Sequence, residues 1–184
     1  TKMALISGSY SEKPELSFLT NEMKYAAREK VNKEAGTRRM FSHAIFTPGW
    51  PGWLEKFDEE NEKLRPDSWK GYTIGDNQSK GTVKHPFRLD DEKLVYPFYE
   101  KAVKAGITTI CIHKGLLPPD YEKSYAGVWE YATAQDIGKA AKDWPQMKFV
   151  MYHACLRPAF ELPAQAWTEF EQTGRIRWVS ELAD

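Results

Sequence analysis

Short apolar runs rich in β-branched residues alternate with longer segments of helical periodicity along this sequence of 184 residues. Such runs are typical of buried strands. When a helical segment joins two such strands, the strands pair in parallel through a right-handed connection. The alternation therefore predicts a single α/β domain over residues 1–184 with a parallel sheet. The six strand candidates are residues 3–7, 40–46, 68–74, 107–113, 148–153 and 176–181.

Five crossover segments separate these runs, and most of them carry helical signals. Apolar side chains recur there every three or four residues, and Gly or Pro residues follow as stop signals. Thr133 and Asp136 have the spacing of a capping box. The polar residues 75–84 are typical of a mobile loop and form a candidate lid. The expected helices cover residues 14–35, 53–64, 93–105, 134–144 and 164–172.

The charge balance excludes nucleic acid as the main partner. The 26 Lys and Arg residues are matched by 26 Asp and Glu residues, so no basic excess is present to follow a phosphate backbone. No apolar run approaches the roughly 20 residues that span a bilayer, and we expect no membrane partner. The two cysteines, Cys111 and Cys155, lie in apolar runs, which favours reduced thiols and a cytoplasmic protein.

Two histidines close neighbouring strand candidates. In parallel α/β proteins, reactive groups gather at the carboxyl ends of the strands, so His113 and His153 should meet at one rim. Neutral imidazole is a common ligand of zinc and iron, and a catalytic metal site needs about three protein ligands. The alternative, which the sequence leaves equally open, is that each histidine is a hydrogen-bonded structural residue. A closed zinc site with Cys111 and Cys155 is a further alternative, although buried inert thiols are favoured.

Lys70 lies where the third strand candidate gives way to the polar loop. A lysine at a barrel rim can act as a base with a shifted pKa, as an anion contact or as a carbamylated ligand, and a solvated lysine is the plain alternative. His43 lies within its strand, which indicates a core residue or one that supports the ligands. His85 precedes Pro86 in a loop and is expected at the surface or in the lid.

Four segments together resemble a known family. Ser-Trp-Lys-Gly-Tyr-Thr at 68–73, Arg-Leu-Asp-Asp-Glu at 88–92, Ile-Cys-Ile-His-Lys-Gly-Leu at 110–116 and Phe-Val-Met-Tyr-His at 149–153 resemble the amidohydrolase-related metal-dependent hydrolases. These proteins are (β/α)8 barrels of the amidohydrolase superfamily. The similarity extends over residues 40–181.

The resemblance implies roles for three residues. His113 corresponds to the metal-ligating histidine that closes the fifth strand of the family. His153 corresponds to the histidine that closes the sixth strand, which is a ligand in some members and a catalytic group in others. Lys70 lies in the region of the fourth strand, where some branches carry a carbamylated lysine.

The family also has features that this sequence lacks. The His-x-His pair of the first strand is absent, and the aspartate that closes the eighth strand would lie beyond Asp184. The resemblance therefore implies an incomplete TIM-barrel-like (β/α)8 domain with about six of the eight βα units. We expect the missing strands to come from a complementing chain segment or from another copy in a homo-oligomer.

The function that follows is a metal-dependent hydrolase acting on an amide, lactone or related bond of a small-molecule substrate. We expect His113 and His153 as metal ligands, and His153 and Lys70 as the catalytic groups. The cofactor is a divalent metal ion, with zinc favoured over manganese or iron. The alternatives are a metal-dependent non-oxidative decarboxylase of an aromatic acid and a non-catalytic barrel fragment.

Overall fold

The computed structural model describes residues 2–9, 11, 17–75, 84–156 and 163–184. The lid predicted over residues 75–84 lies almost wholly outside these residues. Within them, no helix is long and apolar enough to cross a membrane.

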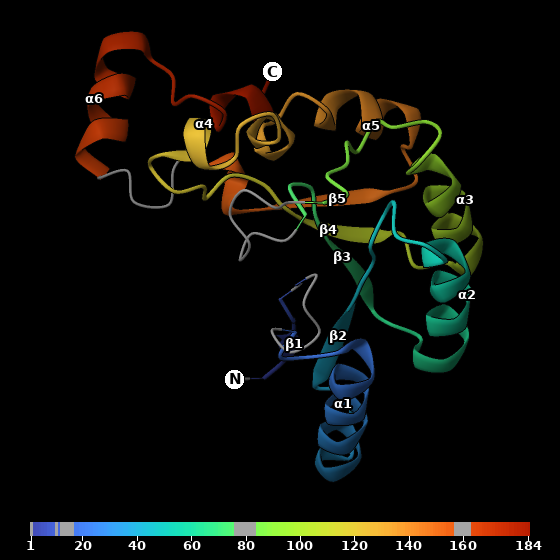
Figure 1. The fold of residues 1–184 in the computed structure, drawn as a ribbon. Coiled ribbons are helices and arrows are strands. Elements are labelled where there is room, and N and C mark those ends of the chain that lie inside the picture. The colour runs from blue at the N-terminus through green and yellow to red at the C-terminus, as the bar shows by residue number, and fades with distance from the viewer. Residues whose placement is uncertain (1, 10, 12–16, 76–83, 157–162) are drawn as a thin grey trace.

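Five parallel strands form one sheet, as the alternating sequence pattern predicts. Their order in the sheet is the order in the chain, so each connection leads to the adjacent strand, as it does in a barrel (Figure 1). The sheet does not close: among the described strands, the first and the last each have a single neighbour. The strands are β1 (Ala4–Ile6), β2 (Met40–Ile45), β3 (Ser68–Tyr72), β4 (Thr109–His113) and β5 (Lys148–Tyr152).

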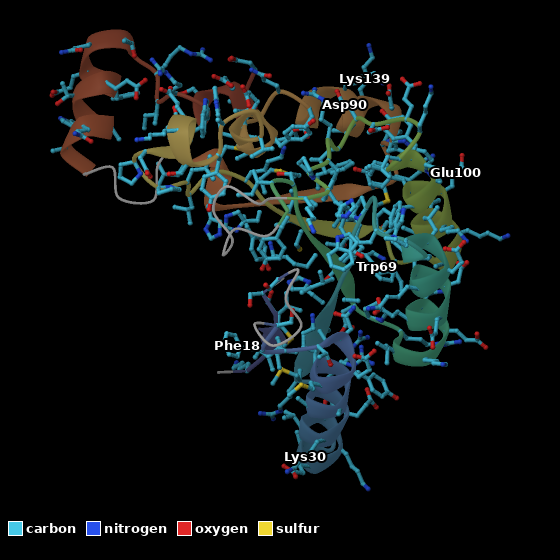
Figure 2. All side chains as sticks on the ribbon, viewed as in Figure 1. Phe18, Lys30, Trp69, Asp90, Glu100 and Lys139 are labelled. Carbon is cyan, nitrogen blue, oxygen red and sulfur yellow. The ribbon has the colours of Figure 1, made fainter. Side chains whose placement is uncertain are left out.

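Helices lie along one side of this sheet, which we call the outer face (Figure 1). The side chain of Trp69 in β3 is fully buried there, with ring centroids 4.4 Å from Phe57 and 5.6 Å from Phe98, and Figure 2 shows it on the side of α2 and α3. This aromatic layer forms the main core. The helices are α1 (Asn21–Ala35), α2 (Trp53–Leu64), α3 (Tyr96–Ala105), α4 (Tyr121–Ser124), α5 (Ile137–Asp143) and α6 (Pro163–Thr173), with 3-10 turns at Trp129–Ala132, His153–Cys155 and Ser180–Leu182.

The opposite face of the sheet, which we call the inner face, is the one that a closed barrel encloses. Side chains alternate between the two faces of a strand, and the inner face carries Lys70, Cys111 and Tyr152. An open cavity of about 470 Å³ lies against this face. Leu5 and Val150 line the cavity and are 45% and 42% exposed, because no helix or strand among the described residues covers them.

The sixth predicted strand, residues 176–181, is wrong. These residues form a turn followed by the 3-10 turn Ser180–Leu182, and Trp178 has a φ of 65°. Trp178 is buried in a second, smaller cluster, where its ring stacks on Trp129 at 5.9 Å and lies 5.5 Å from Tyr121. The described part of the chain thus has five βα-type strands rather than six.

The start of the first helix and the predicted capping box also differ from the prediction. The first helix begins at Asn21, not at residue 14, because the Thr20 side chain accepts a hydrogen bond from the Met23 backbone and caps it there. Thr133 and Asp136 do not form a capping box. The Thr133 hydroxyl donates to the carbonyl of Glu130, and the Asp136 carboxylate pairs with Lys114.

Candidate functional site

His113 and His153 come together at the carboxyl edge of the sheet. His113 is the last residue of β4, and His153 directly follows β5. Their ring centroids are 4.6 Å apart at an interplanar angle of 66°. The predicted meeting of two imidazoles at one rim is therefore present in the structure.

The backbone after β5 is what turns His153 toward its partner. Tyr152 pairs in register with His113 and shares its face, so a continued strand would point residue 153 to the outer face. Instead, three consecutive residues, His153, Ala154 and Cys155, have φ values of 65°, 48° and 57°. Left-handed backbone is uncommon for residues other than glycine, and such strain is concentrated at functional sites.

Lys70 lies on the same inner face, beside the two histidines. Its side chain is only 2% exposed, and its Nζ lies 4.3 Å from the ring centroids of both Tyr72 and Tyr152. No described residue accepts a hydrogen bond from this amine. Burial lowers the pKa of Lys70 to about 8, since an unpaired ammonium loses its hydration there. The plain alternative of a solvated lysine is wrong.

A hydrogen-bonded network joins the inner faces of three strands behind Lys70. Nδ1 of His43 lies 2.6 Å from the hydroxyl oxygen of Ser68, and Nε2 of His43 lies 2.8 Å from the hydroxyl oxygen of Tyr152. His43 is 1% exposed, as expected for a histidine within a strand. This network fixes the Tyr152 ring where it contacts Lys70.

The imidazoles at this rim are held in the neutral form. Burial, followed by the charge of Lys70, lowers the pKa of His113 to about 3, and the same two causes lower the pKa of His153. The pKa of His43 falls to about 4 for these reasons and because of the charge of Lys24. Neutral imidazole has a free lone pair, which is the form that binds a metal or accepts a proton.

The fit of a metal ion to these residues is partial. His113 and His153 provide two nitrogen donors of the right chemistry. Within the described ranges, however, no group of three or more His, Cys, Asp or Glu side chains is placed to hold an ion. Cys111 lies on the inner face, whereas Cys155 is buried in the second apolar cluster with Trp178, and both thiols are free. The two cysteines therefore do not form a zinc site with the histidines.

The remaining sequence candidate, His85, lines a small pocket together with Tyr72 and Trp50. Its ring packs against the indole of Trp50 at 5.7 Å, and the residue is exposed, as expected for a loop position. Sequence reasoning missed Tyr152 as a partner of Lys70 and His43. The alternation of β5 was a usable signal, because it places Tyr152 on the face opposite to Met151.

Five parallel strands in chain order, with helices on the outer face, define an α/β protein of the TIM-barrel type whose barrel is not closed. An uncharacterized TIM-barrel protein from Bordetella bronchiseptica has a similar structure, with a TM-score of 0.58 and 15% sequence identity. The match covers 95% of this chain and 52% of that protein, so this chain spans about half its length. No family model and no curated protein matches the sequence. The likeness shows the fold, and membership of the amidohydrolase-related family stays a prediction.

Proposed function

We propose that this chain carries part of the site of a metal-dependent hydrolase of the amidohydrolase type, which acts on an amide, lactone or related bond of a small molecule. One observation carries the proposal: the 4.6 Å approach of the His113 and His153 rings at the carboxyl edge of a parallel sheet. This edge is where TIM-barrel enzymes have their active sites. The strained backbone at His153 supports a functional role for the pair.

The two imidazoles would hold the metal ion, together with at least one ligand from outside the described residues. When bound, a divalent metal such as zinc, or alternatively manganese or iron, lowers the pKa of a water molecule and polarises a carbonyl. His113 is the more buried of the two residues and is kept neutral by its surroundings, which suits a permanent ligand. His153 is exposed, and it is therefore the better candidate for a group that also exchanges protons with the substrate.

Lys70 would be the second catalytic group. With a pKa of about 8, a fraction of its amine is neutral at pH 7 and able to accept a proton. In its charged form, the same group attracts an anionic part of the substrate. A carbamate on Lys70 would instead turn a cation into an anion and add an oxygen ligand to the two imidazoles.

A decarboxylase of an aromatic acid is the second candidate, and the surroundings of Lys70 favour it. The buried ammonium of Lys70 has no hydrogen-bond acceptor among the described residues, and the carboxylate of an aromatic acid would provide one. The rings of Tyr72 and Tyr152 beside it offer faces on which the aromatic group can pack. The two candidates differ in their products. A hydrolase releases an acid and an alcohol or amine from a lactone or amide, whereas a decarboxylase releases carbon dioxide from an aromatic acid.

We also propose that further strands, from a complementing chain segment or another copy, cover the inner face in the working protein. Unpaired strand edges and exposed apolar side chains such as Met3, Leu5 and Val150 are costly in an isolated sheet. The native particle should therefore be heavier than a chain of 184 residues, which sedimentation or native mass spectrometry measures. A native mass equal to that of this chain would contradict the idea.

Metal analysis of the native assembly tests the function. We expect about one zinc, manganese or iron ion per site in the wild type and a loss of most of that metal in His113→Ala. His85→Ala is the matched control, because His85 is an exposed histidine whose ring packs on Trp50, and it should retain the metal. A folded native assembly that contains no metal and hydrolyses none of a panel of lactones and amides would refute the proposal and favour a non-catalytic barrel fragment.

A further inference from the structure

A second cavity lies between the starts of two helices, and we call it the α1–α2 pocket. Its volume is about 280 Å³. It is lined by residues that follow β1, by the N-terminal cap and first turn of α1, by the end of β2 and the loop after it, and by the start of α2. None of its described lining residues belongs to the inner-face cavity, and neither His113 nor His153 is among them. The α1–α2 pocket is therefore separate from the site proposed for the hydrolase.

Two indoles provide the apolar part of the α1–α2 pocket. Trp50 lies in the loop after β2, Trp53 is the first residue of α2, and both are half-buried. Each indole packs on a second ring, with the Trp50 centroid 5.7 Å from that of His85 and the Trp53 centroid 6.2 Å from that of Phe98. Indoles held in this way offer flat apolar surfaces to a ligand at little cost in side-chain entropy.

Hydroxyl and amide side chains provide the polar part of the pocket. Asn21 is buried, and its side chain is fixed by bonds to both backbone groups of Ile45 and to the carboxylate of Glu60. A hydroxyl has one donor and two acceptor positions, so a hydroxyl with one bond inside the protein can still bond a ligand. The lining residues that carry hydroxyls are Ser9, Ser11, Ser17, Thr20 and Thr47.

The charges of the lining favour a neutral ligand. Glu22 and Lys56 are the charged lining residues, they have opposite signs, and both are exposed. An anion would meet the carboxylate of Glu22, and the backbone amide of Met23 at the start of α1 already donates to the hydroxyl of Thr20. A cation would meet the ammonium of Lys56. A neutral molecule with hydroxyl groups can instead donate to Glu22 and accept from Lys56.

We propose that the α1–α2 pocket binds a neutral polyhydroxylated molecule of about the size of a monosaccharide. The C–H face of a sugar ring is apolar and packs on an indole, while its hydroxyls donate and accept hydrogen bonds as the lining residues do. Apolar walls with a few placed polar groups are typical of small-molecule sites. This binding goes beyond the proposed hydrolysis, because it requires no metal and uses none of the residues assigned to that reaction.

Titration calorimetry of the native assembly with a panel of probes tests this inference. The neutral probes are D-glucose, D-galactose, D-xylose and sorbitol, and the charged probes are inorganic phosphate and choline. We expect at least one neutral probe to bind with a Kd of about 10 mM or tighter, and neither charged probe to displace it. Failure of all four neutral probes to bind, or displacement of the bound probe by phosphate or choline, would overturn the inference.

Two variants place the binding in the α1–α2 pocket. Trp50→Leu should weaken it roughly tenfold or more, because it removes a flat wall of the pocket. Trp167→Leu is the matched control, since Trp167 is 61% exposed on α6 outside the pocket, and it should leave the Kd unchanged. Glu22→Gln changes an exposed side chain, and it should weaken the binding severalfold because an amide is a poorer acceptor than a carboxylate. Equal effects of Trp50→Leu and Trp167→Leu, or an unchanged Kd in Glu22→Gln, would contradict this placement.

A third variant separates this binding from the proposed hydrolase. The neutral probe should bind His113→Ala as tightly as the wild type, and binding should persist after metal removal by a chelator. Loss of binding in either case would place the probe beside the histidines and overturn the assignment to the α1–α2 pocket. A native assembly that contains no metal and still binds the probe would refute the hydrolase alone.

Discussion

Nε2 of His43 and the hydroxyl oxygen of Tyr152 lie 2.8 Å apart, although the two residues are 109 positions apart in the sequence. His43 belongs to β2 and Tyr152 to β5, so the bond passes over the inner faces of β3 and β4. The bond connects β2 to β5 across the inner face. It also holds the tyrosine ring against Nζ of Lys70, which connects the fold to the candidate site.

Removing this hydroxyl should destabilise the protein. Tyr152→Phe keeps the ring and leaves Nε2 of the buried His43 without its partner, which is expected to lower the free energy of unfolding by about 1–3 kcal/mol. Urea unfolding of the native assembly measures the change. Tyr96→Phe is the control, because that hydroxyl donates to Asp143 at the surface, and its loss should change stability by less than about 0.5 kcal/mol. Equal effects of the two variants would contradict this role for the bond.

The same histidine predicts how stability depends on pH. The pKa of His43 is about 4 in the folded protein and about 6.5 in the unfolded chain, so the unfolded state binds more protons between these values. The contribution of His43 to the free energy of unfolding is therefore complete above about pH 6.5. As the pH falls toward 4, roughly 3 kcal/mol of this contribution is lost, at about 1.4 kcal/mol per pH unit. His43→Gln should flatten this part of the stability profile. A variant profile parallel to that of the wild type would show that His43 does not cause it.

The turn that carries His153 should depend on Gly115. This glycine has a φ of 76°, and a Cβ there would lie 2.5 Å from the backbone carbon of Cys155. Gly115→Ala should displace the turn, separate the imidazoles of His113 and His153 and reduce metal content severalfold. Gly127→Ala is a close control, because Gly127 has the same φ of 76° with nothing within 4 Å of the added carbon. Gly127→Ala should lower the stability of the protein through backbone strain alone. It should leave the metal content, measured by elemental analysis, unchanged.

The sheet could be predicted from local pattern, because buried parallel strands need continuous β-branched and apolar runs. The run at residues 176–181 has the same local character and is not a strand. Trp178 is buried there against Trp129 and Tyr121, which are distant in the sequence, and these aromatic contacts outweigh strand propensity. A pattern read within one segment carries no information about such contacts.

The candidate site was predictable in part for a related reason. The strand-end rule brings His113 and His153 together, because carboxyl ends of adjacent parallel strands share an edge. The left-handed backbone that turns His153 inward has no sequence signal, since none of its three residues is a glycine. The position of Lys70 at the end of a strand left a buried and a solvated lysine both open. Lysines are almost always exposed, so nothing in the sequence indicates that Lys24 and Lys114 are buried.

The last prediction concerns Lys114, which directly follows His113 and anchors the end of β4. Its Nζ is fully buried and lies 2.7 Å and 2.9 Å from the carboxylate oxygens of Asp136 and 2.7 Å from the carbonyl oxygen of Tyr131. The Asp136 carboxylate also accepts a hydrogen bond from the backbone of Leu89. This group of contacts joins β4 to the start of α5 and to the segment that precedes α3.

Lys114→Met should lower the free energy of unfolding by about 3–5 kcal/mol, because it leaves the Asp136 carboxylate buried without its cation. Adding Asp136→Asn should recover part of this loss, since the remaining amide is uncharged. Lys139→Ala removes an ion pair of the same type with Asp143 at the surface, and water screens that pair, so its effect on stability should be much smaller. If denaturant titration of the native assembly gave similar values for Lys114→Met and Lys139→Ala, the Lys114 ion pair would not be what holds the end of β4 in place.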